Sequence, residues 1–248
     1  MSGHSKWSSI KHKKAATDAK RGQLFTKLAR DITMAARQGD PSPDANAALR
    51  LAVLKARAAN MPGENIDRAI KKAVGGGEGA NLQEVSYEGY GPGGTAVIVQ
   101  AVTDNRNRTV AEVRFAFSRG GGNLGEAGAV GWQFDTRGLI TIDTTGKDAD
   151  EVQMMAIEAG ALDIDLGDDT MDVITEPSDL HKVREALEAL GLAVESAELA
   201  AIPKSKVELN EKDSEAALRL FEKLDDLDDV SRVYSNAVIS DAILAAAD

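Results

Sequence analysis

The chain opens with MSGHSKWSSIKHKKAATDAKRGQLFTKLAR, which contains eight Lys or Arg residues and a single acid, Asp18. Ammonium and guanidinium groups neutralise phosphates and release counterions, which gives affinity without sequence choice. The serine hydroxyls can donate to phosphate oxygens, and an exposed indole can stack on an unpaired base. We therefore predict nucleic-acid contacts from Lys6, Trp7, Lys11, His12, Lys13, Lys14, Lys20, Arg21, Lys27 and Arg30.

Two of these residues also have simpler interpretations. Trp7 can serve as a hydrophobic anchor that holds the basic arm against the helices that follow it. His12 can donate to a phosphate when it is protonated, or it can be an ordinary exposed side chain. Both alternatives stay open at this stage.

A second cationic set lies in TDNRNRTVAEVRFAFSRGGG, within an otherwise acidic part of the chain. Arg106 and Arg108 fall where a helix is expected to begin, and free N–H groups and the helix dipole favour anions there. We predict that Arg106, Arg108 and Arg119 extend the nucleic-acid contact. The alternative for Arg108 is an ion pair with Glu112, one helical turn away.

Other chemistry finds little support in the sequence. Two glycine runs match G-x-G-x-x-G, but a dinucleotide site needs a strand before the run and a helix after it, and neither run has that context. We interpret both as backbone turns. The Asp-rich segments 163–169 and 225–229 are interpreted as solvent-exposed. We expect no catalytic residues, metal, cofactor or small-molecule substrate. The two runs are Gly89, Gly91 and Gly94, and Gly120, Gly122 and Gly125.

The charge of the chain is divided unevenly. Residues 1–75 contain 15 Lys and Arg against 6 Asp and Glu, a net of +9, whereas residues 76–248 contain 14 against 34, a net of −20. Such asymmetry indicates a cationic module that binds a polyanion, carried by an acidic body. The chain has no cysteine and no apolar run long enough to span a membrane, so we expect a cytoplasmic protein without a membrane partner.

The first 75 residues show the periodicity of three helices. A helix over about 16–38 places Leu24, Leu28, Ile32 and Ala35 on one face. A second is expected to begin with Ser42 as N-cap and Pro43 in the first position, burying Leu51, Leu54 and Ala58 before it ends at Pro62. A third follows over 63–74. Residues 76–83 are interpreted as a linker.

The remaining pattern alternates strands and helices, so the predicted class is α+β. Residues 137–203 give the order β-α-β-β-α-β of a ferredoxin-like split βαβ unit. The flanking segments, 84–136 and 204–248, give a second such unit if they are joined, with strands at 128–135 and 204–209 and an edge strand in EVSYEGY. One ferredoxin-like domain is therefore predicted to be inserted into another, after the N-terminal helical domain.

Several segments in order resemble the YebC/PmpR family: GHSKWSSIKHKKAATDAKRGQLFTKLARDIT, ANMPGENIDRAIKK, YEGYGPGG, TDNRNRTVAEVR and GGNLGEAGAVGWQF. The chain departs from the family pattern at Gly63, where Lys is usual, and at Phe115 and Gly120, where relatives often have His. The resemblance implies a helical domain with two α+β domains. It also implies either a cytoplasmic transcriptional regulator that binds DNA or a translation factor that acts on ribosomes; relatives include the mitochondrial translational activator of cytochrome c oxidase.

We therefore expect a non-enzymatic, nucleic-acid-binding regulator of gene expression, with DNA as the first candidate partner. Nothing in the sequence resembles a helix-turn-helix recognition helix, so contacts to phosphate and DNA shape are expected rather than a sharp base code. The alternative is a ribosome-associated factor that binds ribosomal RNA, whose loops expose bases for stacking. A protein-interaction scaffold and an enzyme using the carboxylates of 163–169 are less favoured.

Overall fold

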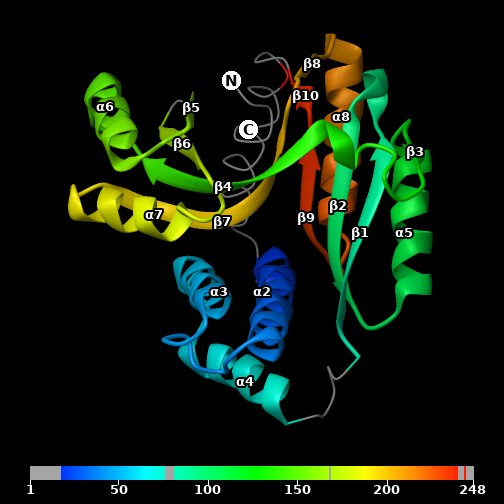
Figure 1. The fold of residues 1–248 in the computed structure, drawn as a ribbon. Helices are drawn as coiled ribbons and strands as arrows, with labels where there is room; N and C mark the ends of the chain where they lie inside the picture. Colours follow the sequence, from blue (N-terminus) through cyan, green and yellow to red (C-terminus); the bar gives the residue numbers. More distant parts are fainter. Residues whose placement is uncertain (1–17, 76–80, 168, 240–242, 244–248) are drawn as a thin grey trace.

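The computed structural model describes residues 18–75, 81–167, 169–239 and 243, with the side chains given from residue 21 onward. Its elements are mixed helices and strands, with a helical region first and two four-stranded sheets after it. In Figure 1 the helical region lies at the bottom, the first sheet with α5 and α8 on the right, and the second sheet with α6 and α7 on the left. The predicted α+β class is confirmed.

The helical region contains α2 (Asp18–Gln38), α3 (Ala47–Ala58) and α4 (Gly63–Val74). Leu28 and Ile32 of α2 pack with Leu49 and Val53 of α3 and with Ile66 of α4 in one apolar cluster. The predicted buried face of α2 is thus confirmed. A single helix of this length cannot bury its apolar face by itself. The packing of the three helices in this shared cluster therefore stabilises the helical region.

The start and the buried face of α3 differ from the prediction. The N-cap is Asn46, whose side chain accepts from Leu49 N and donates to the carbonyls of Ala35 and Asp40. The helix therefore begins later than Ser42, and its buried residues are Leu49, Val53 and Ala56. Leu54 and Ala58, predicted to be buried, are exposed, and Leu51 is partly buried.

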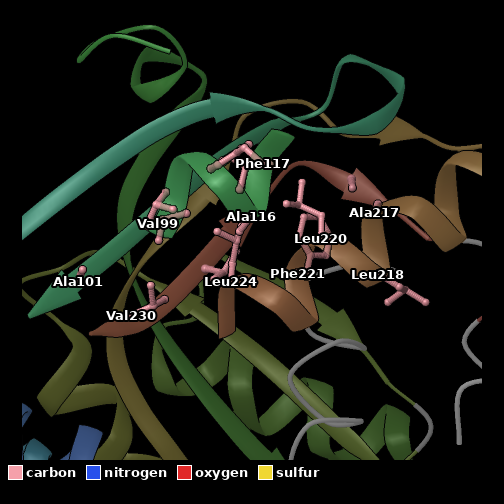
Figure 2. Packing of buried hydrophobic residues seen from close by; sticks show 14 of the residues in the cluster. Val99, Ala101, Ala116, Phe117, Ala217, Leu218, Leu220, Phe221, Leu224 and Val230 are labelled. Atoms are coloured by element: carbon pink, nitrogen blue, oxygen red, sulfur yellow. The ribbon is translucent and has the colours of Figure 1, made fainter. Parts of the chain in front are cut away.

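The first sheet has the strand order β3-β1-β2-β9, with neighbouring strands antiparallel. Helices α5 and α8 pack on one face of it, and Figure 2 shows Phe117 of α5 and Leu220 and Leu224 of α8 gathered against Val99 of β2. The bounds are β1 (Gln83–Tyr90), β2 (Ala96–Thr103), α5 (Arg106–Arg119), β3 (Asn123–Leu124), α8 (Glu211–Asp225) and β9 (Val230–Ser235).

The second sheet has the order β5-β6-β4-β7, again antiparallel throughout. With one helix after its first strand and another after its third, this is the arrangement of the ferredoxin-like unit expected for this part of the chain. The bounds are β4 (Phe134–Asp143), α6 (Ala149–Ala159), β5 (Asp163–Leu166), β6 (Thr170–Thr175), α7 (Leu180–Ala189) and β7 (Ala193–Pro203).

Several strands of the first sheet differ from the prediction. The strand expected over 128–135 is absent, because a short 3₁₀ helix, η2 (Gly131–Gln133), precedes β4, and β4 belongs to the second sheet. The strand expected over 204–209 is only β8 (Val207–Glu208), paired in parallel with β10 (Ala237–Val238). The predicted edge strand is β1, which lies between β3 and β2.

A shared apolar cluster joins the two sheets. Ala96 and Ile98 of β2 point away from α5 and α8, and they pack with Phe134 and Leu139 of β4 and Tyr234 of β9. Strand β2 is therefore buried on both faces, which explains its nearly continuous apolar sequence AVIVQAV. Figure 1 shows β4 and β7 running from the second sheet toward the first.

The glycine run Gly89–Gly94 forms a turn, as predicted for it. It leads from β1 into β2 through the short 3₁₀ helix η1 (Pro92–Gly94), where Gly93 has a φ of 67°. A side chain at Gly93 would be strained in this left-handed conformation, and its Cβ would lie 2.3 Å from Leu209.

Two neighbouring phenylalanines of α5 give a matched test of this packing. Phe117 is fully buried between the sheet and α8, whereas Phe115 is 65% exposed. We expect Phe117→Ala to lower the free energy of unfolding by about 3–5 kcal/mol, because it leaves a cavity. Phe115→Ala should change it by less than about 0.5 kcal/mol. Urea denaturation followed by circular dichroism measures both, and equal effects would contradict the assignment of the core.

Candidate nucleic-acid interface

The predicted contact residues fall into two groups in the structure. Lys6, Trp7, Lys11, His12, Lys13 and Lys14 lie outside the described residues, and Lys20 is placed only by its backbone in α2. Their contact with nucleic acid stays a prediction. Arg21, Lys27 and Arg30 of α2 and Arg106, Arg108 and Arg119 of α5 are described with their side chains.

An acidic segment, Asp225–Asp229, lies against the cationic side of α2. Lys27 donates to the carbonyl of Asp225, and Arg30 Nη1 donates to the carbonyl of Asp228 at 2.5 Å. Gln23 Nε2 reaches Asp228 Oδ1 at 3.5 Å. The interpretation of this segment as solvent-exposed is wrong for Asp229, which is 3% exposed and contacts Arg30 of the helical region, whereas Asp226 and Asp228 are exposed.

Asp229 forms ion pairs with one arginine of the helical region and one arginine of α5. Arg30 Nη1 lies 3.0 Å from Asp229 Oδ1, and Arg108 Nη2 lies 2.7 Å from Asp229 Oδ2. The hydroxyls of Thr103 and Thr109 donate to the same Oδ2, at 3.1 and 2.8 Å. Burial alone would raise the pKa of Asp229, but the hydrogen bonds from Arg108 and the two threonines, with the charge of Arg30, lower it.

A second charged cluster ties the helical region to both sheets. Glu198 of β7 accepts from Lys55 of α3 and from Arg232 of β9, each at 2.8 Å, and Asp31 of α2 lies 3.8 Å from Arg232. Burial would raise the pKa of Glu198, but the charges of Arg232 and Lys55 lower it. Burial raises the pKa of Asp31, although Arg232 and Lys55 oppose this. This cluster connects α2 and α3 of the helical region to β7 and β9.

The six described cations therefore differ in what they can contact. Lys27, Arg30 and Arg108 are brought together around the acidic segment. Arg108 also pairs with Asp104 at 2.9 Å, so its ion-pair partners are Asp104 and Asp229 rather than Glu112. Arg106 and Arg119 are exposed on α5, and Arg21 is exposed on α2. The Arg119 guanidinium lies over the Phe115 ring, 5.7 Å from its centroid.

The contact between the acidic segment and α2 was not predicted from the sequence, although the opposite charges of the two segments are consistent with it. DDLDD has the opposite charge to the adjacent stripe of α2, but it lies some 200 residues away in the sequence, and nothing local indicates that the two meet.

Within the described part of the chain, no group of His, Cys, Asp and Glu residues could hold a metal ion. No helix among those residues is long and apolar enough to cross a membrane.

The chain matches two models of protein families. Residues 5–76 match the model described as the TACO1/YebC protein N-terminal domain, and residues 82–237 match the TACO1/YebC second and third domain. A protein of Dehalococcoides mccartyi named a probable transcriptional regulatory protein is 55% identical over 237 residues, which are 96% of this chain and 94% of that protein. One of the same description from Herpetosiphon aurantiacus is 55% identical over 244 residues, 98% and 97% of the two chains.

A solved structure has the same fold. The crystal structure of a conserved hypothetical protein from Aquifex aeolicus superposes with a TM-score of 0.88 at 46% identity, covering 94% of this chain and 96% of that one. The arrangement of the helical region and the two sheets is therefore similar to that of an experimentally observed relative.

Removing the charge of Asp229 tests the junction that its ion pairs with Arg30 and Arg108 form between the helical region and the first sheet. We expect Asp229→Asn to lower the free energy of unfolding by about 3 kcal/mol at pH 7, because two guanidinium groups lose their shared partner. Asp226→Asn is the matched control: Asp226 is exposed at the end of α8, so its substitution should change stability by less than about 0.5 kcal/mol. Urea denaturation measures both.

The pH dependence has a defined sign. The pKa of Asp229 is lower in the folded state than in the unfolded state. Its contribution to the free energy of unfolding is therefore complete above the unfolded-state pKa of about 3.9 and is lost as the pH falls through the folded-state pKa. The difference in the free energy of unfolding between the wild type and Asp229→Asn should therefore become smaller below about pH 4. A difference that stays constant from pH 7 to pH 3 would contradict the ionic origin of the effect.

Proposed function

The chain belongs to the TACO1/YebC family, and we propose that it is a non-enzymatic regulator of gene expression that binds DNA through its basic N-terminal helical region. The division of charge carries this proposal: residues 1–75 have a net charge of +9 and the rest of the chain −20. Such a chain is attracted to a polyanion at one end and repelled by it elsewhere, which orients the bound protein. Relatives named probable transcriptional regulatory proteins support the regulatory class. The proposed site of action is the cytoplasm.

The contacts of the acidic segment divide the proposed interface into two parts. The residues proposed to bind first are the arm cations, joined by Arg106 and Arg119; Lys20 and Arg21 of α2 are proposed contacts as well. Lys27, Arg30 and Arg108 contact the Asp225–Asp229 segment in the folded chain, so a phosphate competes with that segment for them. Phosphate contacts of this kind position a protein without reading base sequence.

The second candidate function is that of a ribosome-associated translation factor. It is favoured by Trp7, which stands among the arm lysines, because loops of structured RNA present unpaired bases on which an indole can stack. Co-sedimentation with ribosomes, compared with recovery of cross-linked DNA from the same cells, separates the two functions. Neither function includes catalysis, a cofactor or a small-molecule substrate.

Charge reversal in the arm tests both functions against a protein scaffold. We expect Lys11→Glu, Lys13→Glu and Lys14→Glu, combined, to weaken binding to DNA and RNA. Each phosphate that the variant no longer neutralises should lower the salt slope of the binding constant by about 0.9 on duplex DNA. Fluorescence anisotropy from 50 to 200 mM salt measures this slope.

The matched control reverses three exposed lysines of the acidic body, Lys147, Lys182 and Lys212, and so makes the same change in net charge. Its slope should stay near that of the wild type. An equal decrease in both triple variants would show that only net charge matters, and unchanged binding by the arm variant would favour the scaffold.

A further inference from the structure

One face of α2 contacts the acidic segment Asp225–Asp229 through polar side chains. Gln23, Lys27 and Arg30 follow one another at spacings of four and three residues, so they lie on the same side of the helix. Lys27 donates to the carbonyl of Asp225, Arg30 Nη1 lies 3.0 Å from Asp229 Oδ1, and Gln23 reaches the segment as well. Lys27 and Arg30 are only partly exposed. This arrangement of α2 on the acidic segment is the docked form of the chain.

The acidic segment offers these cations the same kinds of group as a phosphate chain does. It follows α8, and the carbonyl that Lys27 contacts belongs to the last residue of that helix. The C-terminal end of a helix carries partial negative charge from the helix dipole. The segment adds four carboxylates in five residues. Ammonium and guanidinium groups make charge-assisted hydrogen bonds to carboxylates and to phosphates alike.

Charge and hydrogen bonds, rather than a shared apolar cluster, join α2 to the first sheet. Among the described residues, the apolar cluster around Leu28 and Ile32 is confined to the helical region. No described residue of α2 belongs to the apolar clusters of the two sheets, and the helical region reaches them through Leu51 of α3. Partly exposed ion pairs are weakened by salt, and parts of a chain without a large apolar interface move relative to each other.

Separating α2 from the acidic segment leaves the buried carboxylate with partners. Asp229 Oδ2 accepts from Arg108 at 2.7 Å and from the hydroxyls of Thr103 and Thr109, all within the first-sheet region. Only the contact of Arg30 with Oδ1 crosses to the helical region. The high cost of an unpaired buried charge therefore does not oppose this separation.

We propose that this face of α2 is a site with two alternative occupants, and that nucleic acid releases the helical region from the first sheet by replacing the acidic segment. The inference rests on the proposed function and adds the regulation of its interface. In the docked form, Lys27 and Arg30 neutralise the chain's own anionic segment, and only the other proposed cations bind phosphate. In the released form both join the interface. A polyanion that binds the released form more tightly shifts the population toward it.

A cross-link that holds the docked form tests this proposal. The chain has no cysteine, so Gln23→Cys and Asp228→Cys introduce the only two thiols, at exposed positions whose native side chains approach to 3.5 Å. A cleavable bis-maleimide joins them. Binding to a DNA duplex and to an RNA of the same sequence is measured by fluorescence anisotropy from 50 to 200 mM salt.

The cross-linked protein should bind both nucleic acids more weakly than the same protein with its two thiols capped separately. On duplex DNA its salt slope should be lower by about 0.9 for each cation kept from the phosphates. Cleavage of the linker should restore the affinity and the slope.

Asp229→Asn should have the opposite effect. It removes the ion pair with Arg30, so more molecules are in the released form and the affinity for DNA should rise about three- to tenfold, although the variant is less stable. This gain should disappear in the cross-linked protein. Asp179→Asn, at an exposed position of the second sheet region, makes the same change in net charge. Phe117→Ala lowers stability without altering the junction. Each of these two controls should change affinity by less than about twofold.

Two results would overturn the inference while leaving the proposed function intact. One is equal affinity and salt slope before and after the linker is cleaved. The other is an affinity of Asp229→Asn no higher than that of Asp179→Asn. A wild type that binds neither the DNA nor the RNA would overturn the proposed function together with this inference.

Discussion

The buried carboxylate of Asp229 is the contact on which the arrangement of the chain depends. Arg30 of the helical region and Arg108 of α5 each place a guanidinium beside it, and the hydroxyls of Thr103 and Thr109 donate to its Oδ2. Arg108, Thr103 and Thr109 already contact Asp229 within the first-sheet region, and Arg30 adds the helical region to this cluster. An unpaired buried ion would cost several kcal/mol. The cluster of Asp31, Lys55, Glu198 and Arg232 begins at the next residue of α2 after Arg30 and contacts the second sheet as well.

This junction gives the cations of the chain different functions. Those that face the acidic segment neutralise it and hold the helical region against the sheets. Those on the exposed side of α5 remain available to a polyanion, as we propose for the arm. A chain with a strongly acidic body can therefore dock its own basic region and still bind phosphate, provided that the two sets of cations lie on different faces.

Local pattern predicted most of the helices and the ferredoxin-like sheet, because periodicity is a property of neighbouring residues. It placed α3 wrongly, since Asn46 caps that helix through contacts with α2 that no local window contains. It also placed β1 at an edge and expected strands at 128–135 and 204–209, because strand order is decided by partners distant in sequence. The burial of Asp229, its ion pairs with Arg30 and Arg108, and the hydrogen bond from Lys27 to the Asp225 carbonyl could not be predicted for the same reason: the residues that meet there come from segments far apart in the chain.

The most direct test of the account is to map where nucleic acid touches the protein in living cells. After ultraviolet cross-linking and protease digestion, mass spectrometry identifies the peptides that carry nucleotides, and sequencing identifies the nucleic acid. We predict cross-links in peptides from residues 1–37 and 106–119, with none from the acidic domain at 137–203. Cross-links concentrated in 137–203, or an absence of cross-links from the first 37 residues, would contradict it.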